Sequence, residues 1–126
     1  MISLELAREL KKAGLKWEPQ LGDFFFMYHP VEQKYSNKPD VIGIGSCSMW
    51  PEDIWLPRLD QLLAEIERRG YGWEMFTSVD GVIVFFVLRK YEILGYKVIA
   101  YDVTGSIPED AAAKALLWIL EKERGE

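Results

Sequence analysis

The chain has 126 residues, of which 49% are hydrophobic, and its 15 basic and 20 acidic side chains give a net charge of −5. This length and composition exclude a chain that is disordered throughout and favour one domain, spanning residues 1–126. A single cysteine excludes an intramolecular disulfide and a four-cysteine zinc site, so we expect a reducing, cytoplasmic location. The longest apolar run, 82–88, is too short to cross a bilayer, and the charged N-terminus lacks the apolar region of a secretory signal. We therefore expect no membrane segment.

The first predicted element is a helix that begins after Ser3. Ser3 suits the N-cap position, Glu5 lies in the positive first turn, and Gly14 suits the left-handed backbone that ends many helices. Apolar residues recur between them at helical spacing: Leu6, Ala7, Leu10 and Ala13. This side of the helix is predicted to face the core.

Two short strands, 23–28 and 41–44, are predicted next, with a turn-rich loop at 29–40 between them. A second helix is predicted over 56–69, with Pro57 in its first turn. Proline is tolerated there because a backbone N–H in the first turn has no hydrogen-bond partner within the helix. Its apolar stripe is Leu59, Leu62, Leu63 and Ile66.

Three longer strands are predicted after this helix, over 71–77, 82–88 and 96–103. Asp80 and Gly81 predict a tight hairpin between the first two. The strand over 82–88 is apolar on both faces, which favours a central position in the sheet or a covering partner surface.

The last predicted helix has a capping-box pattern at its start, formed by Ser106 and Glu109, and runs to about Glu123. The residues expected to face inward are Ala113, Leu116, Leu117 and Leu120. The predicted order is α-β-β-α-β-β-β-α, an α+β fold with helices packed on an antiparallel sheet.

Few residues offer catalytic chemistry. Cys47 and His29 are the single thiol and the single imidazole, and together they are the minimum for an activated thiol nucleophile. Their surroundings match no thiol-protease signature, and one histidine excludes a metal site with two histidines. We therefore expect no catalytic, cofactor-binding or metal-binding residues, and the protein is predicted not to be an enzyme.

Two adjacent pairs of carboxylates could in principle bind a metal ion, namely Glu52 with Asp53 and Glu109 with Asp110. Both pairs are interpreted as charges that stabilise the positive ends of helices.

The helix-β-β-β-helix order over 56–123 resembles that of double-stranded-RNA-binding domains, and 111–116 resembles their alanine-rich stretch. In that family a lysine cluster at the start of the last helix binds phosphates, whereas this chain has Glu109 and Asp110 there. Affinity for a polyanion depends on basic side chains. We therefore keep a nucleic-acid-associated module only as the alternative interpretation and do not expect a nucleic-acid partner.

The segment 50–57 places two tryptophans and two prolines in eight residues. Two interpretations of Trp50 and Trp55 remain open: they close the edge of the core, or they anchor a partner protein. Trp118 lies off the apolar stripe of its helix and is the residue predicted to serve self-association.

Two segments, Gly14–Phe24 and Trp55–Ile66, resemble short uncharacterised proteins of phages and prophages from Gram-positive bacteria. The segment Pro108–Ala113, with the strands before it, is similar to the phage α-β-α sandwich family, whose function is unknown. The resemblance implies a small accessory protein that binds an unidentified protein partner of the host or the phage. It implies no catalytic or cofactor-binding residue.

Overall fold

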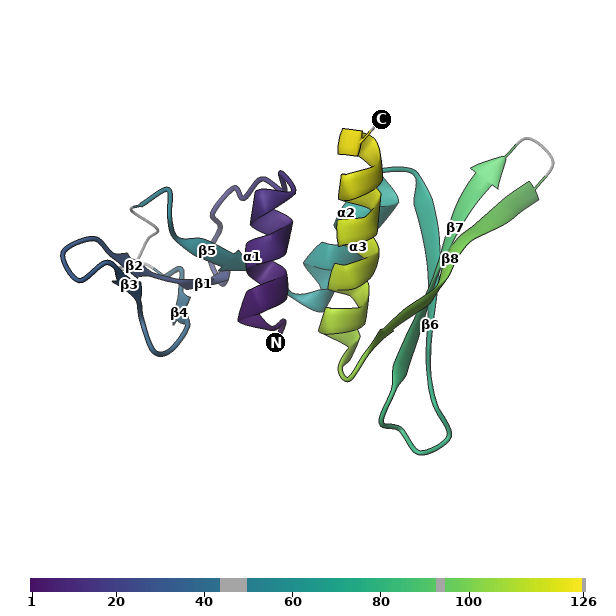
Figure 1. Cartoon of the computed structure of the whole chain (residues 1–126), viewed down its shortest axis with the longest axis horizontal. Coiled ribbons are helices and arrows are strands. Elements are labelled where there is room, and N and C mark those ends of the chain that lie inside the picture. Colours follow the sequence, from purple (N-terminus) through teal and green to yellow (C-terminus); the bar gives the residue numbers. More distant parts are fainter. Residues whose placement is uncertain (44–49, 93–94, 126) are drawn as a thin grey trace.

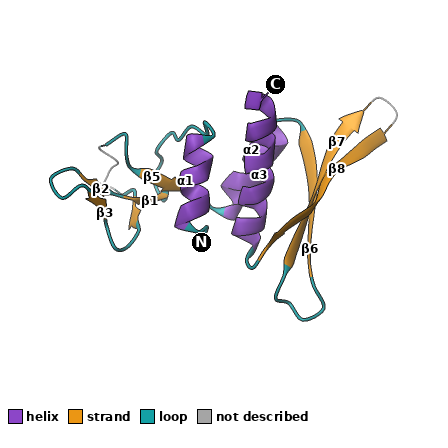
Figure 2. Cartoon of the chain, in the orientation of Figure 1, coloured by secondary structure: helices purple, strands orange, loops and turns teal. Residues whose placement is uncertain are grey.

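The computed structural model describes residues 1–43, 50–92 and 95–125. The elements in this part of the chain are α1 (Leu4–Lys12), β1 (Phe24–Phe26), β2 (Tyr28–His29), β3 (Lys34–Tyr35), β4 (Asp40–Val41), β5 (Ile54–Leu56), α2 (Leu59–Arg68), β6 (Tyr71–Thr77), β7 (Val84–Glu92), β8 (Gly95–Gly105) and α3 (Pro108–Gly125). The helices and antiparallel sheets confirm the predicted α+β class, and the element order agrees in outline with the prediction (Figures 1 and 2).

The C-terminal part is an antiparallel sheet of order β6-β7-β8, with α2 and α3 on the same side of it (Figure 1). The apolar strand predicted from the sequence is therefore central, as β7. Its buried side chains, Val84, Phe86 and Leu88, alternate with residues on the opposite face, as the two-residue period of a strand requires.

The N-terminal part contains a second antiparallel sheet, of order β4-β1-β5, and the small β2-β3 pair. Strand β5 was not predicted from the sequence. Ile54 and Leu56 are both buried, and Trp55 between them lies opposite Phe25 of β1. Three residues give too short a pattern to be recognised without their pairing partner.

Helix α1 lies between the N-terminal sheet and α3, and it contacts both β5 and α3 (Figure 1). Its predicted ends are confirmed, because Ser3 Oγ accepts a hydrogen bond from the backbone N–H of Leu6 and Gly14 has a φ of 102°. The buried side of α1 joins one apolar cluster that also includes residues of β5, α2, β7 and α3.

The start of α2 differs from the prediction. The helix begins at Leu59, and Pro57 is fully buried ahead of the N-cap residue, Arg58. The Gln61 side chain accepts a hydrogen bond from the backbone N–H of Arg58 at 2.9 Å. Residues 54–56 pair with β1, so they are not available to the first turn of a helix.

The predicted start of the strand at residue 82 was wrong. Val82 and Ile83 precede β7 and are exposed, since they belong to the end of the β6–β7 hairpin. In α3, Leu117 packs against the core as predicted but is only partly buried, whereas Ile119, which was not predicted to face inward, is fully buried. Because α3 contacts α1, α2, β7 and β8, its buried surface is wider than one stripe.

Candidate functional site

Three tryptophans, Trp17, Trp50 and Trp55, line a pocket of about 260 Å³ beside α1. The other lining residues are Ala7, Leu10, Lys11 and Leu15 from α1 and its end, together with Pro19, Pro51, Asp53 and Pro57. We call this the tryptophan pocket. Trp50 and Trp55 were predicted from the sequence as candidate partner-binding residues, whereas Trp17 was not.

One wall of the tryptophan pocket is formed by stacked aromatic rings. Trp55 projects from β5, and its ring lies 6.3 Å from that of Trp17, with an angle of 4° between the ring planes. Trp17 also contacts Phe25 of β1 at a ring distance of 5.5 Å. Because Trp17 follows α1 and Trp55 belongs to β5, this wall depends on the tertiary fold.

The position of Trp17 is set by Asp23, whose side chain is only 2% exposed. Trp17 Nε1 donates to Asp23 Oδ2 at 2.9 Å, and the backbone N–H of Gln20 donates to the same oxygen at 3.1 Å. Gln61 Nε2 donates to Asp23 Oδ1 at 2.7 Å, and Arg58 Nη1 lies 3.4 Å from that oxygen. These bonds hold the segment carrying Trp17 against the start of α2.

The loop that carries Trp50 also lines the pocket, and the Trp50 side chain is 42% exposed. Asp53, which is buried, accepts hydrogen bonds from the backbone N–H groups of Tyr28 and Trp50 at 2.7 and 3.3 Å. Lys11 Nζ donates to the backbone oxygens of Pro51 and Asp53. The Asp53 carboxylate and the Lys11 ammonium group thus hold this loop in place, while the Trp50 side chain stays partly exposed.

A second depression, of about 520 Å³, adjoins the pocket at Lys11 and Pro51. It is lined by the basic side chains Arg8, Lys11 and Lys12, together with Tyr35, Glu52 and Ile54. Burial lowers the pKa of Lys11, an effect that Asp53 and Glu52 oppose. The guanidinium of Arg8 lies 5.2 Å from the ring centre of Tyr35. We call this region the basic depression.

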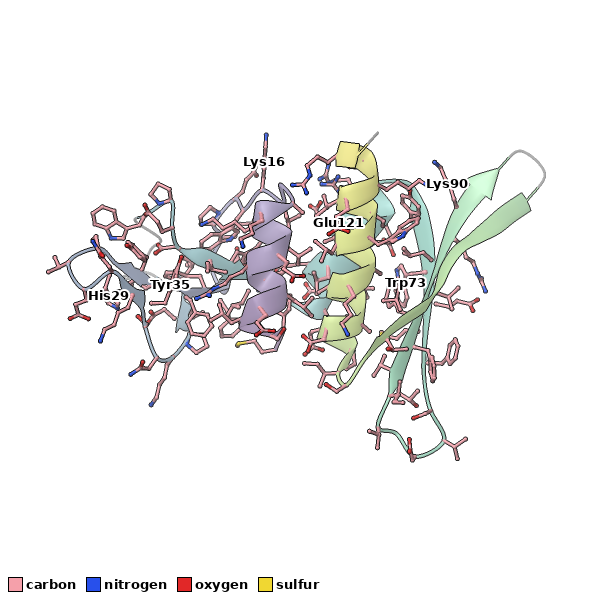
Figure 3. The ribbon with its side chains drawn as sticks, in the orientation of Figure 1. Lys16, His29, Tyr35, Trp73, Lys90 and Glu121 are labelled. Carbon is pink, nitrogen blue, oxygen red and sulfur yellow. The ribbon has the colours of Figure 1, made fainter. Side chains whose placement is uncertain are left out.

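The side chain of Tyr35 forms part of this depression on the side of α1 away from α3 (Figure 3). Its hydroxyl donates to the backbone oxygen of Glu52 at 2.8 Å. Burial raises the pKa of Tyr35, so its neutral form is favoured in the folded protein. The hydroxyl therefore remains a hydrogen-bond donor across the neutral pH range.

The remaining tryptophans lie elsewhere. Trp118 is partly buried and lines a groove with Leu6 and Leu117, and Lys122 Nζ lies 5.1 Å from its ring centre. Trp73 lies between α3 and the sheet (Figure 3), where it stacks on a buried phenylalanine of β7. The structure therefore brings Trp50 and Trp55 together and leaves Trp118 at a separate surface.

The one sequence signal that could have identified Trp17 is a shared spacing. Trp17 is followed by Pro19 and Trp55 by Pro57, so both members of the stacked pair begin a Trp-x-Pro motif. In each motif the proline lines the same pocket as its tryptophan.

Of the two residues considered for catalysis, His29 lies among the described residues and Cys47 does not. His29 Nε2 lies 2.7 Å from Ser36 Oγ. Cys47 lies outside the described residues, so its pairing with His29 stays untested. Among the residues that the structure describes, no cluster of three or more His, Cys, Asp or Glu side chains is arranged to hold a metal ion.

The interpretation of the carboxylate pairs is corrected in one case. Glu52 and Asp53 precede β5 rather than a helix, and Asp53 binds backbone groups of its own loop. Glu109 and Asp110 do lie in the first turn of α3. Glu109 accepts from the N-terminal ammonium group at 2.7 Å, and Asp110 accepts from the backbone N–H of Ser3 at 2.8 Å.

Comparisons of the chain with protein-family models, curated proteins and solved structures give no match. Within the described ranges, no helix has both the length and the apolar character needed to cross a membrane.

Proposed function

We propose that this chain is a small, non-enzymatic accessory protein that binds a protein partner, and that the tryptophan pocket receives an apolar side chain of that partner. The observation that carries the proposal is a concave site lined by three tryptophans, of which Trp50 is 42% exposed. Aromatic side chains at the centre of a pocket supply much of the binding energy in protein interfaces. Trp50 and Trp55 keep the partner-binding role predicted from the sequence, and Trp17 joins them.

The chemistry of the lining favours an extended, proline-containing segment as the ligand. Grooves lined by aromatic rings bind polyproline segments because these need no backbone hydrogen bonds and lose little entropy on binding. The adjoining basic depression contributes Arg8, Lys11 and Lys12 against one acidic side chain, Glu52. We therefore propose that acidic residues flank the proline of the partner segment.

The proposal is tested by following the indole N–H signals of the five tryptophans by NMR while a peptide is added. The probe is a short peptide of consecutive prolines flanked by glutamates, and the control peptide replaces the prolines with alanines. We expect the signals of Trp17, Trp50 and Trp55 to shift with the proline peptide alone. The signals of Trp73 and Trp118 serve as internal controls, because neither residue lines the pocket.

The matched variants are Trp50→Ser and Val31→Ser, which both remove an exposed apolar side chain. Trp50→Ser should weaken binding at least about tenfold with little change in melting temperature, whereas Val31→Ser should leave both unchanged. Absence of any indole shift with the proline peptide would contradict the proposal. A large loss of stability in Trp50→Ser would instead identify Trp50 as a core residue. Trp55 is less suitable for substitution, because it packs within β5 against Trp17.

A nucleic-acid-associated module remains the alternative, but the charges give it less support. Glu109 and Asp110 occupy the position at which a phosphate-binding lysine cluster would be needed, and both carboxylates bind the start of the chain. The relationship to phage and prophage proteins, the cytoplasmic location and self-association through Trp118 stay predictions from the sequence.

A further inference from the structure

The basic depression is a positive site on an acidic chain. Among the described residues that line it, Arg8, Lys11 and Lys12 are basic and Glu52 alone is acidic, which gives a local charge of +2 against −5 for the whole chain. The segment 44–49 contains no Lys, Arg, Asp or Glu, and the sheet β6-β7-β8 lies beyond α3 (Figure 1). Neither therefore alters this balance. The local excess of positive charge indicates an anionic ligand.

The three basic side chains project from one side of α1. Positions 8, 11 and 12 are three and four residues apart, so their side chains are neighbours on the helix surface. The guanidinium of Arg8 lies over the ring of Tyr35, and Lys11 uses two of its three N–H donors for the backbone oxygens of Pro51 and Asp53. Two of the three cations are thus held in position before a ligand binds.

The phosphoryl group of a phosphorylated side chain matches these donors better than a carboxylate does. It carries about two negative charges at neutral pH and has three acceptor oxygens, whereas a carboxylate has one charge and two oxygens. The depression offers one basic side chain for each phosphoryl oxygen, and a dianion balances its charge of +2. Burial lowers the pKa of Lys11, and a dianion beside it would oppose that effect, as Asp53 and Glu52 already do.

The place of the depression connects this anion with the ligand of the tryptophan pocket. The two sites share Lys11 and Pro51 as lining residues. An extended segment bound in the pocket therefore reaches the depression within about one or two residues, at about 3.1 Å for each residue of a polyproline helix. A polynucleotide fits less well, because its affinity depends on many phosphate contacts and the depression presents three cations at one place.

We propose that the segment bound by the tryptophan pocket carries a phosphorylated serine or threonine beside its proline, and that the basic depression binds the phosphoryl group. This inference rests on the proposed function, since the pocket must bind the proline. It goes further by making the affinity depend on phosphorylation of the partner. Serine and threonine have short side chains, which suits two sites that adjoin each other directly.

Isothermal titration calorimetry of the full chain with three peptides tests the proposal. Each peptide has two prolines on either side of a central residue, which is phosphoserine, serine or glutamate. We expect the phosphoserine peptide to bind at least about tenfold more tightly than the serine peptide, and more tightly than the glutamate peptide as well. Added sodium chloride should reduce the ratio of phosphoserine to serine affinity, because exposed charges are screened.

Arg8→Gln and Lys12→Gln each remove one cation from the depression, and neither residue lines the tryptophan pocket. Each variant should reduce the ratio of phosphoserine to serine affinity at least about threefold. Lys16→Gln is the matched control and should leave this ratio unchanged. It removes the same charge from an exposed residue that projects away from the depression, just beyond the end of α1 (Figure 3). Lys11 is left intact, because its hydrogen bonds hold the loop of the pocket.

Equal affinities for the phosphoserine and serine peptides would overturn this inference and leave the proposed function standing, as would equal affinities for the phosphoserine and glutamate peptides. A ratio that neither Arg8→Gln nor Lys12→Gln reduces would also overturn it, by placing the phosphoryl group elsewhere. Displacement of the phosphoserine peptide by an equal concentration of inorganic phosphate, or of a short RNA duplex, would assign the depression to another anion. If none of the three peptides binds, the proposed function fails together with this inference.

Discussion

Asp23 is the buried carboxylate on which one wall of the tryptophan pocket depends. A buried charge is tolerated only when hydrogen bonds replace its lost hydration, and Asp23 has donors on both oxygens. The donors come from Trp17 and Gln20, before it in the chain, and from Arg58 and Gln61, far beyond it. No local pattern around residue 23 predicts this set.

Replacing Asp23 with alanine is expected to lower the free energy of unfolding by about 2–4 kcal/mol, because several buried donors lose their acceptor together. Urea unfolding followed by tryptophan fluorescence measures the loss. Asp60→Ala is the control, since this carboxylate is 73% exposed and should cost less than about 1 kcal/mol. Equal losses in the two variants would contradict the structural role of Asp23.

At the scale of elements, the connection from β8 to α3 requires close approach of two backbones. A Cβ atom on Gly105 would lie 2.7 Å from the backbone nitrogen of Ala111, well inside van der Waals contact. Ala111 is fully buried in the first turns of α3, so neither backbone can move away freely. Gly105 therefore determines how closely the helix lies against the end of the sheet.

The variant Gly105→Ala should cost about 1–3 kcal/mol, because one methyl group must displace packed backbone. Differential scanning calorimetry should show this as a melting temperature lower by several degrees. Gly43→Ala is the matched control, as its added Cβ would meet no atom of the described residues within 4 Å. A melting temperature that falls equally in both variants would show that loss of glycine flexibility, rather than contact with α3, is responsible.

At the scale of the whole molecule, α1 links the two sheets into one structure. It contacts β5 on one side and α3 on the other, and Leu10 in its C-terminal half is almost fully buried. Leu10 also lines the tryptophan pocket, so the same side chain belongs to the core and to the proposed site. Buried residues of α1 and β5 belong to the same apolar cluster as those of α2, β7 and α3.

Leu10→Ala is therefore expected to destabilise the whole molecule, by about 2–5 kcal/mol, through the cavity it leaves. Unfolding should remain one transition, with fluorescence and far-UV circular dichroism curves that coincide. Lys12→Ala, at an exposed position of the same helix, should change stability by less than about 0.5 kcal/mol. Two separate transitions in the Leu10 variant would show that the N-terminal sheet unfolds independently.

The features that could be predicted correctly from the sequence are those that depend on neighbouring residues. The N-cap at Ser3 and the left-handed end at Gly14 were predicted correctly, because capping involves groups within a few residues of each other. The apolar character of the predicted strand over 82–88 favoured a central position or a covering surface, and the pairing of β7 with both β6 and β8 decides for the central position. Trp50 and Trp55 could be selected as a pair because they lie in one short segment.

The contacts between distant segments could not be predicted in this way. The pairing of β5 with β1 and the stacking of Trp17 on Trp55 join residues that are far apart in the sequence. Loop closure over such distances is driven by burial of the whole core, and the pattern of any one segment does not encode it. For this reason the sequence indicated only Trp50 and Trp55 as candidate surface residues. In the folded chain, these two tryptophans and Trp17 line one pocket.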